Sequence, residues 1–138
     1  MQKIGWLLIF NNMARFDEAI KKILDHEGGY VNNPKDKGGE TYMGISRKAH
    51  PKSKVWSIID KVTIKYKTVS TINKYLKQNA ELTKLIKDIY KREYWNPFNL
   101  DKEKNQRLAN QIFDNAVNMG VTKTKNMLAR VKNEMASI

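Results

Sequence analysis

The chain has 138 residues, a length that fits a single domain with its own hydrophobic core. It contains no cysteine, which excludes disulfides, a thiol nucleophile and cysteine-ligated metal sites, and its two histidines offer little for a zinc site. The 26 Lys and Arg residues outnumber the 14 Asp and Glu residues, and the net charge of +12 predicts attraction to nucleic acid, anionic lipid or acidic wall polymers.

The first twelve residues, MQKIGWLLIFNN, contain one lysine followed by a short apolar run from Ile4 to Phe10. A membrane-spanning helix needs about 20 apolar residues, so this run is too short to span a bilayer. A secretory signal also needs a small-residue cleavage site, and no clear Ala-x-Ala follows here. We therefore expect residues 1–12 to be a tail that precedes the domain, and a signal peptide is disfavoured.

Residues 14–26 carry apolar side chains at helical spacing, and Gly28 and Gly29 then predict the end of that helix. The following stretch, residues 30–44, is rich in Asn, Pro, Asp and Gly, which is turn chemistry. Because apolar residues flank this stretch, we expect a short, irregular β-hairpin that uses Tyr30, Val31, Tyr42 and Ile45.

The rest of the chain predicts mostly helices. Ser46 suits the N-cap of a short helix that ends at Pro51, and residues 61–67 alternate in a way that fits a short strand or, nearly as well, a helix. Helical spacing returns over residues 70–78, 81–95 and 106–119 and from residue 122 onward. The predicted fold class is therefore mainly α (α+β): a helical domain with one β-hairpin after the first helix.

Glu27 is the strongest catalytic candidate. It lies three residues after Leu24 and four after Ile23, so it projects from the apolar stripe in the last turn of the first helix. Burial and the negative end of the helix dipole both disfavour the ionised carboxylate. A carboxylic acid kept protonated is what a general acid in glycoside hydrolysis requires. The alternative is a residue at a frayed helix end that points into water.

Two residues of the turn-rich stretch extend this hypothesis. Asp36 supplies a second carboxylate and Thr41 a water-positioning hydroxyl if the hairpin folds back toward Glu27. The structural alternatives are an Asx turn for Asp36 and an ordinary strand hydroxyl for Thr41. Glu40 is a further carboxylate, which we expect to point to solvent.

Four segments, HEGGYVNNP, DKGGETYMGI, IYKREYW and FDNAVNMG, resemble glycoside hydrolase family 108. The resemblance covers residues 16–120 and is poorest over residues 52–87. These proteins are N-acetylmuramidases, often from phages or prophages. The resemblance implies a lysozyme-like fold, cleavage of the β-1,4 bond between N-acetylmuramic acid and N-acetylglucosamine, Glu27 as the catalytic acid, and no metal or other cofactor. The spacing of Glu27, Asp36 and Thr41 is also similar to that of phage-type lysozymes, although one residue fewer precedes the threonine here.

The chain departs from the family pattern in two places. Family members usually carry a small residue where this chain has Glu40, which adds a negative charge near the expected site. They also usually continue through a longer helical, peptidoglycan-binding-type segment, of which this chain carries only the beginning. We therefore expect a tail over residues 1–12, a catalytic domain over residues 13–97 and a C-terminal segment over residues 98–138 that is either naturally compact or shortened.

Glycan clefts hold sugars on aromatic rings and bind N-acetyl groups with amide side chains. On this basis the expected substrate-binding residues are Tyr30, Tyr42, Tyr94, Trp95, Asn115 and Asn118. Each has a structural alternative, since aromatic residues also build cores and amides also hold loop backbones.

The expected partner is the peptidoglycan glycan strand, with anionic wall polymers as a further target for the basic surface. A non-catalytic module that binds wall glycan is the alternative function. Nucleic acid is disfavoured, because no recognised nucleic-acid motif is present. We expect a monomer that stays in the bacterial cytoplasm until a holin-like or other route releases it to the periplasm or wall.

Overall fold

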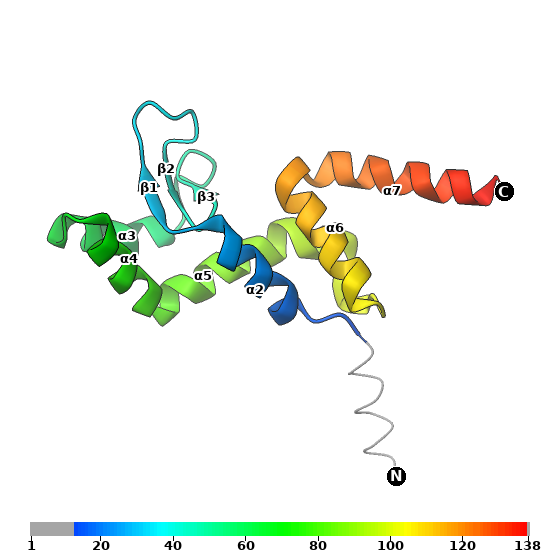
Figure 1. Cartoon of the computed structure of the whole chain (residues 1–138), viewed down its shortest axis with the longest axis horizontal. Helices are drawn as coiled ribbons and strands as arrows, with labels where there is room; N and C mark the ends of the chain where they lie inside the picture. The colour runs from blue at the N-terminus through cyan, green and yellow to red at the C-terminus, as the bar shows by residue number, and fades with distance from the viewer. Residues whose placement is uncertain (1–12, 138) are drawn as a thin grey trace, which may run out of the picture. The chain divides into compact units, whose positions relative to one another are not determined.

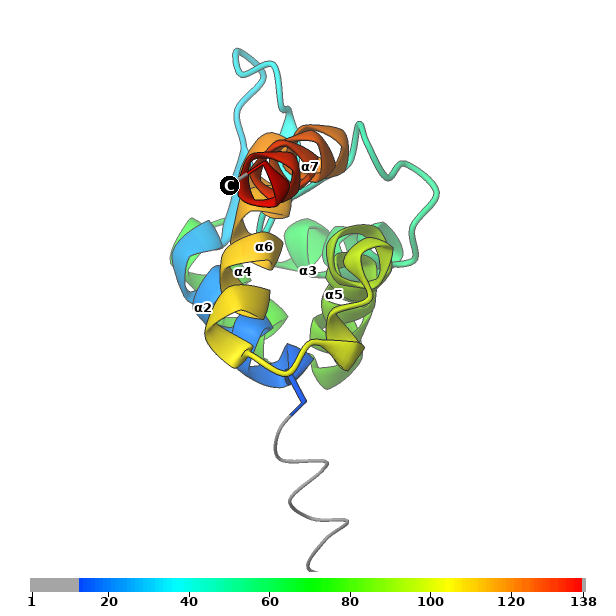
Figure 2. The same cartoon turned by 90° about the vertical axis from the view of Figure 1, so that its right-hand side faces the viewer.

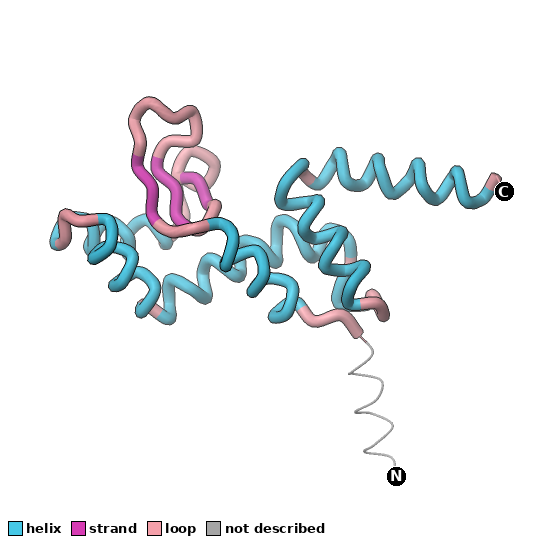
Figure 3. The backbone as a smooth tube through the Cα atoms, in the orientation of Figure 1, coloured by secondary structure: helices cyan, strands magenta, loops and turns pink. Residues whose placement is uncertain are grey.

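The computed structural model describes residues 13–137, so the predicted tail over residues 1–12 lies outside the described part. Helices make up most of the described chain, and its strands form one small sheet (Figure 3). The predicted class, mainly α (α+β) with a short hairpin after the first helix, is confirmed and is consistent with a lysozyme-like fold.

The chain divides into two compact units. One comprises residues 21–89, and the other comprises residues 90–137 together with residues 13–20. These units are defined by packing, so the boundary that we predict at residue 97 on functional grounds stays a prediction.

The first helix, α2, covers Phe16–Glu27, as its apolar spacing predicts. Three strands follow, β1 (Tyr30–Asn32), β2 (Glu40–Tyr42) and β3 (Ile45–Ser46). They form an antiparallel sheet in the order β1-β2-β3, drawn in cyan in Figure 1. The register places Tyr30 opposite Tyr42 and Asn32 opposite Glu40. Because paired residues share a face and successive residues alternate, these four side chains lie on one face of the sheet.

Three helices complete the unit of residues 21–89: α3 (Val55–Lys65), α4 (Val69–Gln78) and α5 (Ala80–Tyr90). Helix α4 contacts both α3 and β1. The core contains apolar side chains that recur at helical spacing: Val55, Trp56, Ile59, Ile72, Leu76, Leu82, Ile86 and Ile89. The Thr68 side chain caps α4 by accepting a hydrogen bond from the Thr71 backbone, so the helix begins at Val69, one residue before the predicted start.

Two local predictions are wrong, and the choice left open for residues 61–67 is decided in favour of a helix as far as residue 65. Residues 47–49 form a turn and not a short helix, although the Ser46 hydroxyl accepts bonds from the Lys48 and Ala49 backbones in the manner of a cap. Residues 61–65 continue α3 rather than forming a strand, because Val55, Trp56 and Ile59 bury one helical face. The α-helix that begins at residue 80 ends at Tyr90 and continues to Trp95 as a π-helical turn.

In the other unit, the π-helical turn Lys91–Trp95 leads through two short 3₁₀ turns to α6 (Gln106–Met119) and α7 (Val121–Ala136). Helix α6 has the predicted bounds, and Gly120 with φ of +94° separates it from α7 (Figure 2). The core of this unit is an aromatic cluster in which the Trp95 ring lies 5.5 Å from both Phe16 and Phe113. The end of the apolar stripe on α7 is exposed, at Val131 and Met135.

The hydroxyl of Tyr42 is buried without a hydrogen-bond partner among the described residues, and burial raises the pKa of Tyr42 to about 12. The Tyr42 hydroxyl therefore stays protonated in the folded state near pH 10, where it ionises in the unfolded chain. This contribution to stability is intact below pH 10 and is lost as the pH rises toward 12.

We predict that Tyr42→Phe leaves the free energy of unfolding unchanged or raises it near pH 7, because it removes an unpaired buried polar group. Between pH 10 and 12 the variant should avoid a loss of about 2–3 kcal/mol that the wild type suffers. Urea denaturation across this pH range measures both effects. A variant that is clearly less stable at pH 7 would show that the hydroxyl has a partner.

Candidate active site

Glu27 is the last residue of α2, where the sequence places it. Its side chain is half-buried, and its carboxylate has no hydrogen bond or ion pair with any residue of the described chain. Gly28 follows with φ of +74°, a left-handed conformation that ends the helix and that glycine adopts without strain. The chain therefore presents a single carboxyl group, free of partners, at the point where it turns from helix to sheet.

Asn73 of α4 contacts the next two residues, Gly29 and Tyr30. The Tyr30 backbone N–H donates a hydrogen bond of 2.8 Å to Asn73 Oδ1. A Cβ on Gly29 would lie 2.3 Å from the same oxygen, so only glycine allows this approach. In this turn Gly28 thus ends the helix, Gly29 leaves room for the Asn73 side chain, and Tyr30 is bound by that side chain.

An ion-pair network continues from Tyr30 across the sheet. The Tyr30 hydroxyl donates a hydrogen bond to Glu40, and Arg47 donates to Glu40 at 2.7 Å and to both oxygens of Asp60 at 2.8 and 2.9 Å. The Arg47 guanidinium also lies 5.4 Å from the centre of the Trp56 ring. Burial and the bond to Glu40 raise the pKa of Tyr30 to about 12, and the bonds to Asp60 and Glu40 raise the pKa of Arg47.

This network changes the expectation for Glu40. Its side chain is only 14% exposed and is paired with Arg47, so it does not point freely to solvent. The negative charge that distinguishes this chain from the family pattern is therefore paired with Arg47, which Glu40 shares with Asp60 of α3.

Asp36 and Thr41 lie in different parts of the hairpin. Asp36 is exposed in the loop between β1 and β2, where its carboxylate accepts a bond of 3.4 Å from the Gly38 backbone in an Asx-type turn. Thr41 is half-buried in β2 and pairs with Val31 and Ser46, on the opposite sheet face from Glu40. Their catalytic roles stay predictions.

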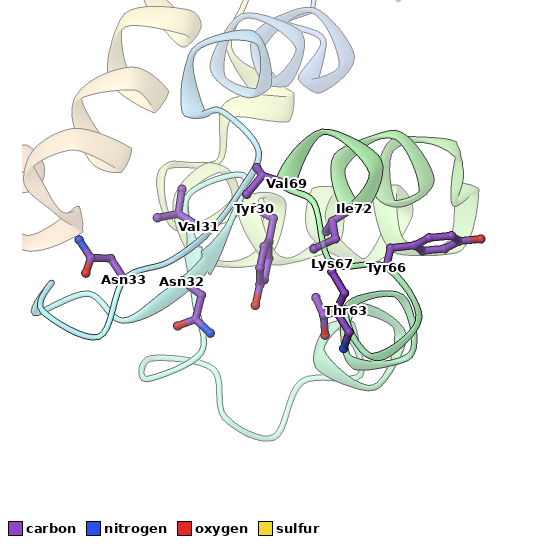
Figure 4. Close-up of a pocket in the computed structure, with 9 residues that line it drawn as sticks. All are labelled: Tyr30, Val31, Asn32, Asn33, Thr63, Tyr66, Lys67, Val69 and Ile72. Atoms are coloured by element: carbon purple, nitrogen blue, oxygen red, sulfur yellow. The ribbon is translucent and has the colours of Figure 1, made fainter.

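A pocket of about 480 Å³ opens between β1 and the ends of α3 and α4. Figure 4 shows Tyr30 in it, with Asn32 on one side and Thr63 and Lys67 on the other. The full lining comprises Tyr30, Val31, Asn32, Asn33, Thr63, Tyr66, Lys67, Val69 and Ile72. Of the expected substrate-binding residues, Tyr30 is the one that lines this pocket, and it follows Glu27 by three positions.

The other expected substrate-binding residues lie elsewhere. Tyr42 and Trp95 are 0% exposed, so both are core residues, and Trp95 donates its indole N–H to Asp101 at 2.8 Å. Tyr94 is half-buried beside Tyr90, with ring centres 5.8 Å apart. A ligand therefore does not reach Tyr42 or Trp95 as the side chains stand.

Two amides of α6 were also expected to bind substrate. Asn115 accepts a hydrogen bond from Gln111, and Asn118 donates one to Asp114, each over 3.2 Å along the helix. With Tyr94 and Trp95 they belong to the unit of residues 90–137, so their placement relative to Glu27 stays a prediction.

Sequence reasoning missed the residues that hold the turn and the pocket. Asn73, Asp60 and Lys67 fall in the middle segment where the family resemblance is poorest, and no local pattern marks them. Arg47 had a signal, because a lone arginine seven residues after Glu40 suits a cross-strand ion pair. In the described chain, no cluster of three His, Asp or Glu side chains suits a metal ion.

The structure is a mainly helical domain with a partner-free carboxyl group at the end of α2 and an open pocket that begins three residues later in the chain, at Tyr30. The family model for glycosyl hydrolase 108 matches residues 20–120, which is more than half of the chain. The chain belongs to this family of peptidoglycan hydrolases, and as such it is a glycosidase with a glycan substrate. No curated protein and no solved structure matches it. Over residues 13–137, no helix is long and apolar enough to cross a membrane.

We predict that Gly29→Ala lowers the free energy of unfolding by about 1–3 kcal/mol, because the new methyl group overlaps Asn73. The matched control is Gly38→Ala, since a Cβ there meets nothing within 4 Å. Thermal or urea denaturation of both variants measures the difference. In the Gly29→Ala background, Asn73→Ala should cost much less than it does in the wild type. Equal costs in both backgrounds would contradict the proposed clash.

Proposed function

We propose that this protein is an N-acetylmuramidase that cleaves the β-1,4 bond between N-acetylmuramic acid and N-acetylglucosamine, with Glu27 as the general acid. The observation that carries the proposal is the Glu27–Tyr30 turn. It lies inside the family match and leaves one carboxyl group without a partner in the described chain. A proton donor must be free of competing cations and hydrogen bonds to reach the glycosidic oxygen.

In the proposed reaction, the Glu27 carboxyl group donates its proton to the glycosidic oxygen as the bond from that oxygen to the anomeric carbon breaks. Positive charge develops on the sugar ring, and a water molecule forms the new C–O bond at the anomeric carbon. The second proton of this water returns to the Glu27 carboxylate or passes to a second carboxylate that later gives it up. The leaving sugar departs with the proton from Glu27. One C–O bond of the anomeric carbon is thereby exchanged for another, and no cofactor is required.

A second carboxylate stabilises the developing charge or orients the water, and we propose Asp36 for this role, with Thr41 positioning the water. The similarity to the lysozyme spacing supports this assignment. The geometry also disfavours Glu40, because Arg47 and Tyr30 already bind its oxygens. The bond between Asp36 and the Gly38 backbone, at 3.4 Å, is weak enough to be exchanged for a contact with substrate.

The basic composition supports a setting at the bacterial wall, whose anionic polymers attract a chain of net charge +12. We propose that the protein acts there after release from the cytoplasm.

We predict that Glu27→Gln abolishes the release of reducing ends from purified peptidoglycan while the melting temperature stays near that of the wild type. The amide has the shape of the carboxyl group but lacks its acidic proton, and no ion pair of the described chain is lost. Asp25→Asn is the matched control, because Asp25 is exposed two residues earlier on the same helix. Wild-type turnover by the Glu27→Gln variant would remove the assignment, and the absence of turnover by the wild type would favour a non-catalytic glycan-binding module.

A further inference from the structure

The pocket that Tyr30 lines has one charged residue. Of the nine residues that line it, Lys67 alone is charged, and the lining contains no acidic side chain. Beyond the lining, Glu40 accepts a bond from the Tyr30 hydroxyl and shares Arg47 with Asp60, so both of these acids are already engaged. Lys67 is therefore the one ionised group of the lining, and it can pair with a carboxylate of a ligand.

The surrounding surface has the same sign of charge. Tyr66 and Tyr75 stack with ring centres 4.2 Å apart, and the ammonium groups of Lys65 and Lys74 lie 5.5 and 5.8 Å from these rings. Tyr66 also lines the pocket, although its ring points away from it in Figure 4. Lys65 and Lys74 thus belong to the tyrosine stack, and Lys67 is the lysine that lines the pocket.

The lining also offers hydrogen bonds and apolar contacts. Asn32, Asn33 and Thr63 provide amide and hydroxyl groups, and Val31 and Val69 are 49% and 59% exposed at the rim. The volume, about 480 Å³, lies within the range of about 300–1,000 Å³ that holds drug-sized ligands. A short peptide has this size and this mixture of amide, alkyl and carboxylate groups.

We propose that this pocket binds the acidic stem peptide that peptidoglycan carries on its muramic acid. In peptide-bearing muramic acid the lactyl carboxyl group is consumed in an amide bond, so the negative charge near the sugar strand resides on the peptide. Lys67 would pair with a peptide carboxylate, while Asn32 and Asn33 would bind the peptide backbone. Tyr30 follows Glu27 after two glycines, so the proposed peptide site and the proposed proton donor lie three residues apart in the chain. The proposal takes its setting from the proposed function.

Peptide binding can be tested without cleavage of any glycan. The tripeptide L-Ala–γ-D-Glu–meso-diaminopimelate is titrated into the wild-type protein and followed by the side-chain amide signals of Asn32 and Asn33 in NMR spectra. We expect these signals to shift and the affinity to fall at higher salt. Lys67→Glu should weaken binding about tenfold, because it sets like charges together, and Lys67→Arg should preserve it.

Lys52→Glu is the matched control, because Lys52 is exposed and lies outside the pocket lining. Its affinity for the tripeptide should stay within about twofold of the wild type, since charge changes at exposed sites contribute little. Equal binding by the Lys67→Glu and Lys52→Glu variants, or shifts that avoid Asn32 and Asn33, would overturn the proposal.

A second comparison separates this proposal from the proposed function. Intact peptidoglycan and glycan strands stripped of peptide are digested by the wild type and by Lys67→Glu. We expect the wild type to prefer the intact polymer and Lys67→Glu to lose most of that preference. Hydrolysis without any such preference would overturn the peptide site and leave the muramidase intact. Tripeptide binding without hydrolysis would retain the site and overturn the muramidase.

Discussion

The candidate site depends on one close contact, between the Asn73 side chain and the turn that follows α2. Asn73 Oδ1 accepts a hydrogen bond of 2.8 Å from the Tyr30 backbone N–H. Gly29 has no Cβ, so there is room for the Asn73 side chain. Because Gly28 ends the helix immediately before this contact, the carboxyl group of Glu27 is presented at a fixed place in the chain. A substitution that moves Asn73 would therefore disturb the end of the helix and the start of the sheet together.

The unit of residues 21–89 contains both carboxylates that are paired with a cation and a carboxylate that has no partner. The acids of the sheet and of α3, Glu40 and Asp60, share one guanidinium, that of Arg47, and the pairing links the sheet to that helix. Glu27 has no such partner among the residues described, and the pocket that starts at Tyr30 carries a lysine instead of an acid. In the proposed reaction this separation matters, because a carboxylate that is paired with a cation is held in its ionised form and is a poor proton donor.

The sequence predicted the parts of the fold that depend on local pattern. Helix α6 has the predicted bounds, since its apolar spacing and terminal glycine agree, and the structure adds an N-cap bond from the Leu108 backbone to Asn105. The end of α2 at Glu27 and the hairpin after it followed from glycines and turn residues. Residues 61–67 have an alternating pattern, but α3 has its buried residues upstream, and this tertiary packing decides in favour of the helix.

The site was predictable only where it follows a motif. Glu27 and Tyr30 belong to one short segment, whereas Asn73 and Lys67 reach it from about forty residues away along the chain. Tyr42 and Trp95 were expected to bind substrate but lie in the core. Sequence alone does not separate the two cases, because an aromatic residue suits a core as well as a glycan-binding surface.

The most direct test of the account is a crystal structure of the Glu27→Gln variant with a bound peptidoglycan tetrasaccharide. The account predicts that the amide at position 27 lies within hydrogen-bonding distance, about 3 Å, of a glycosidic oxygen that links N-acetylmuramic acid to N-acetylglucosamine. A sugar strand bound on another face, with that amide in contact with water alone, would contradict it.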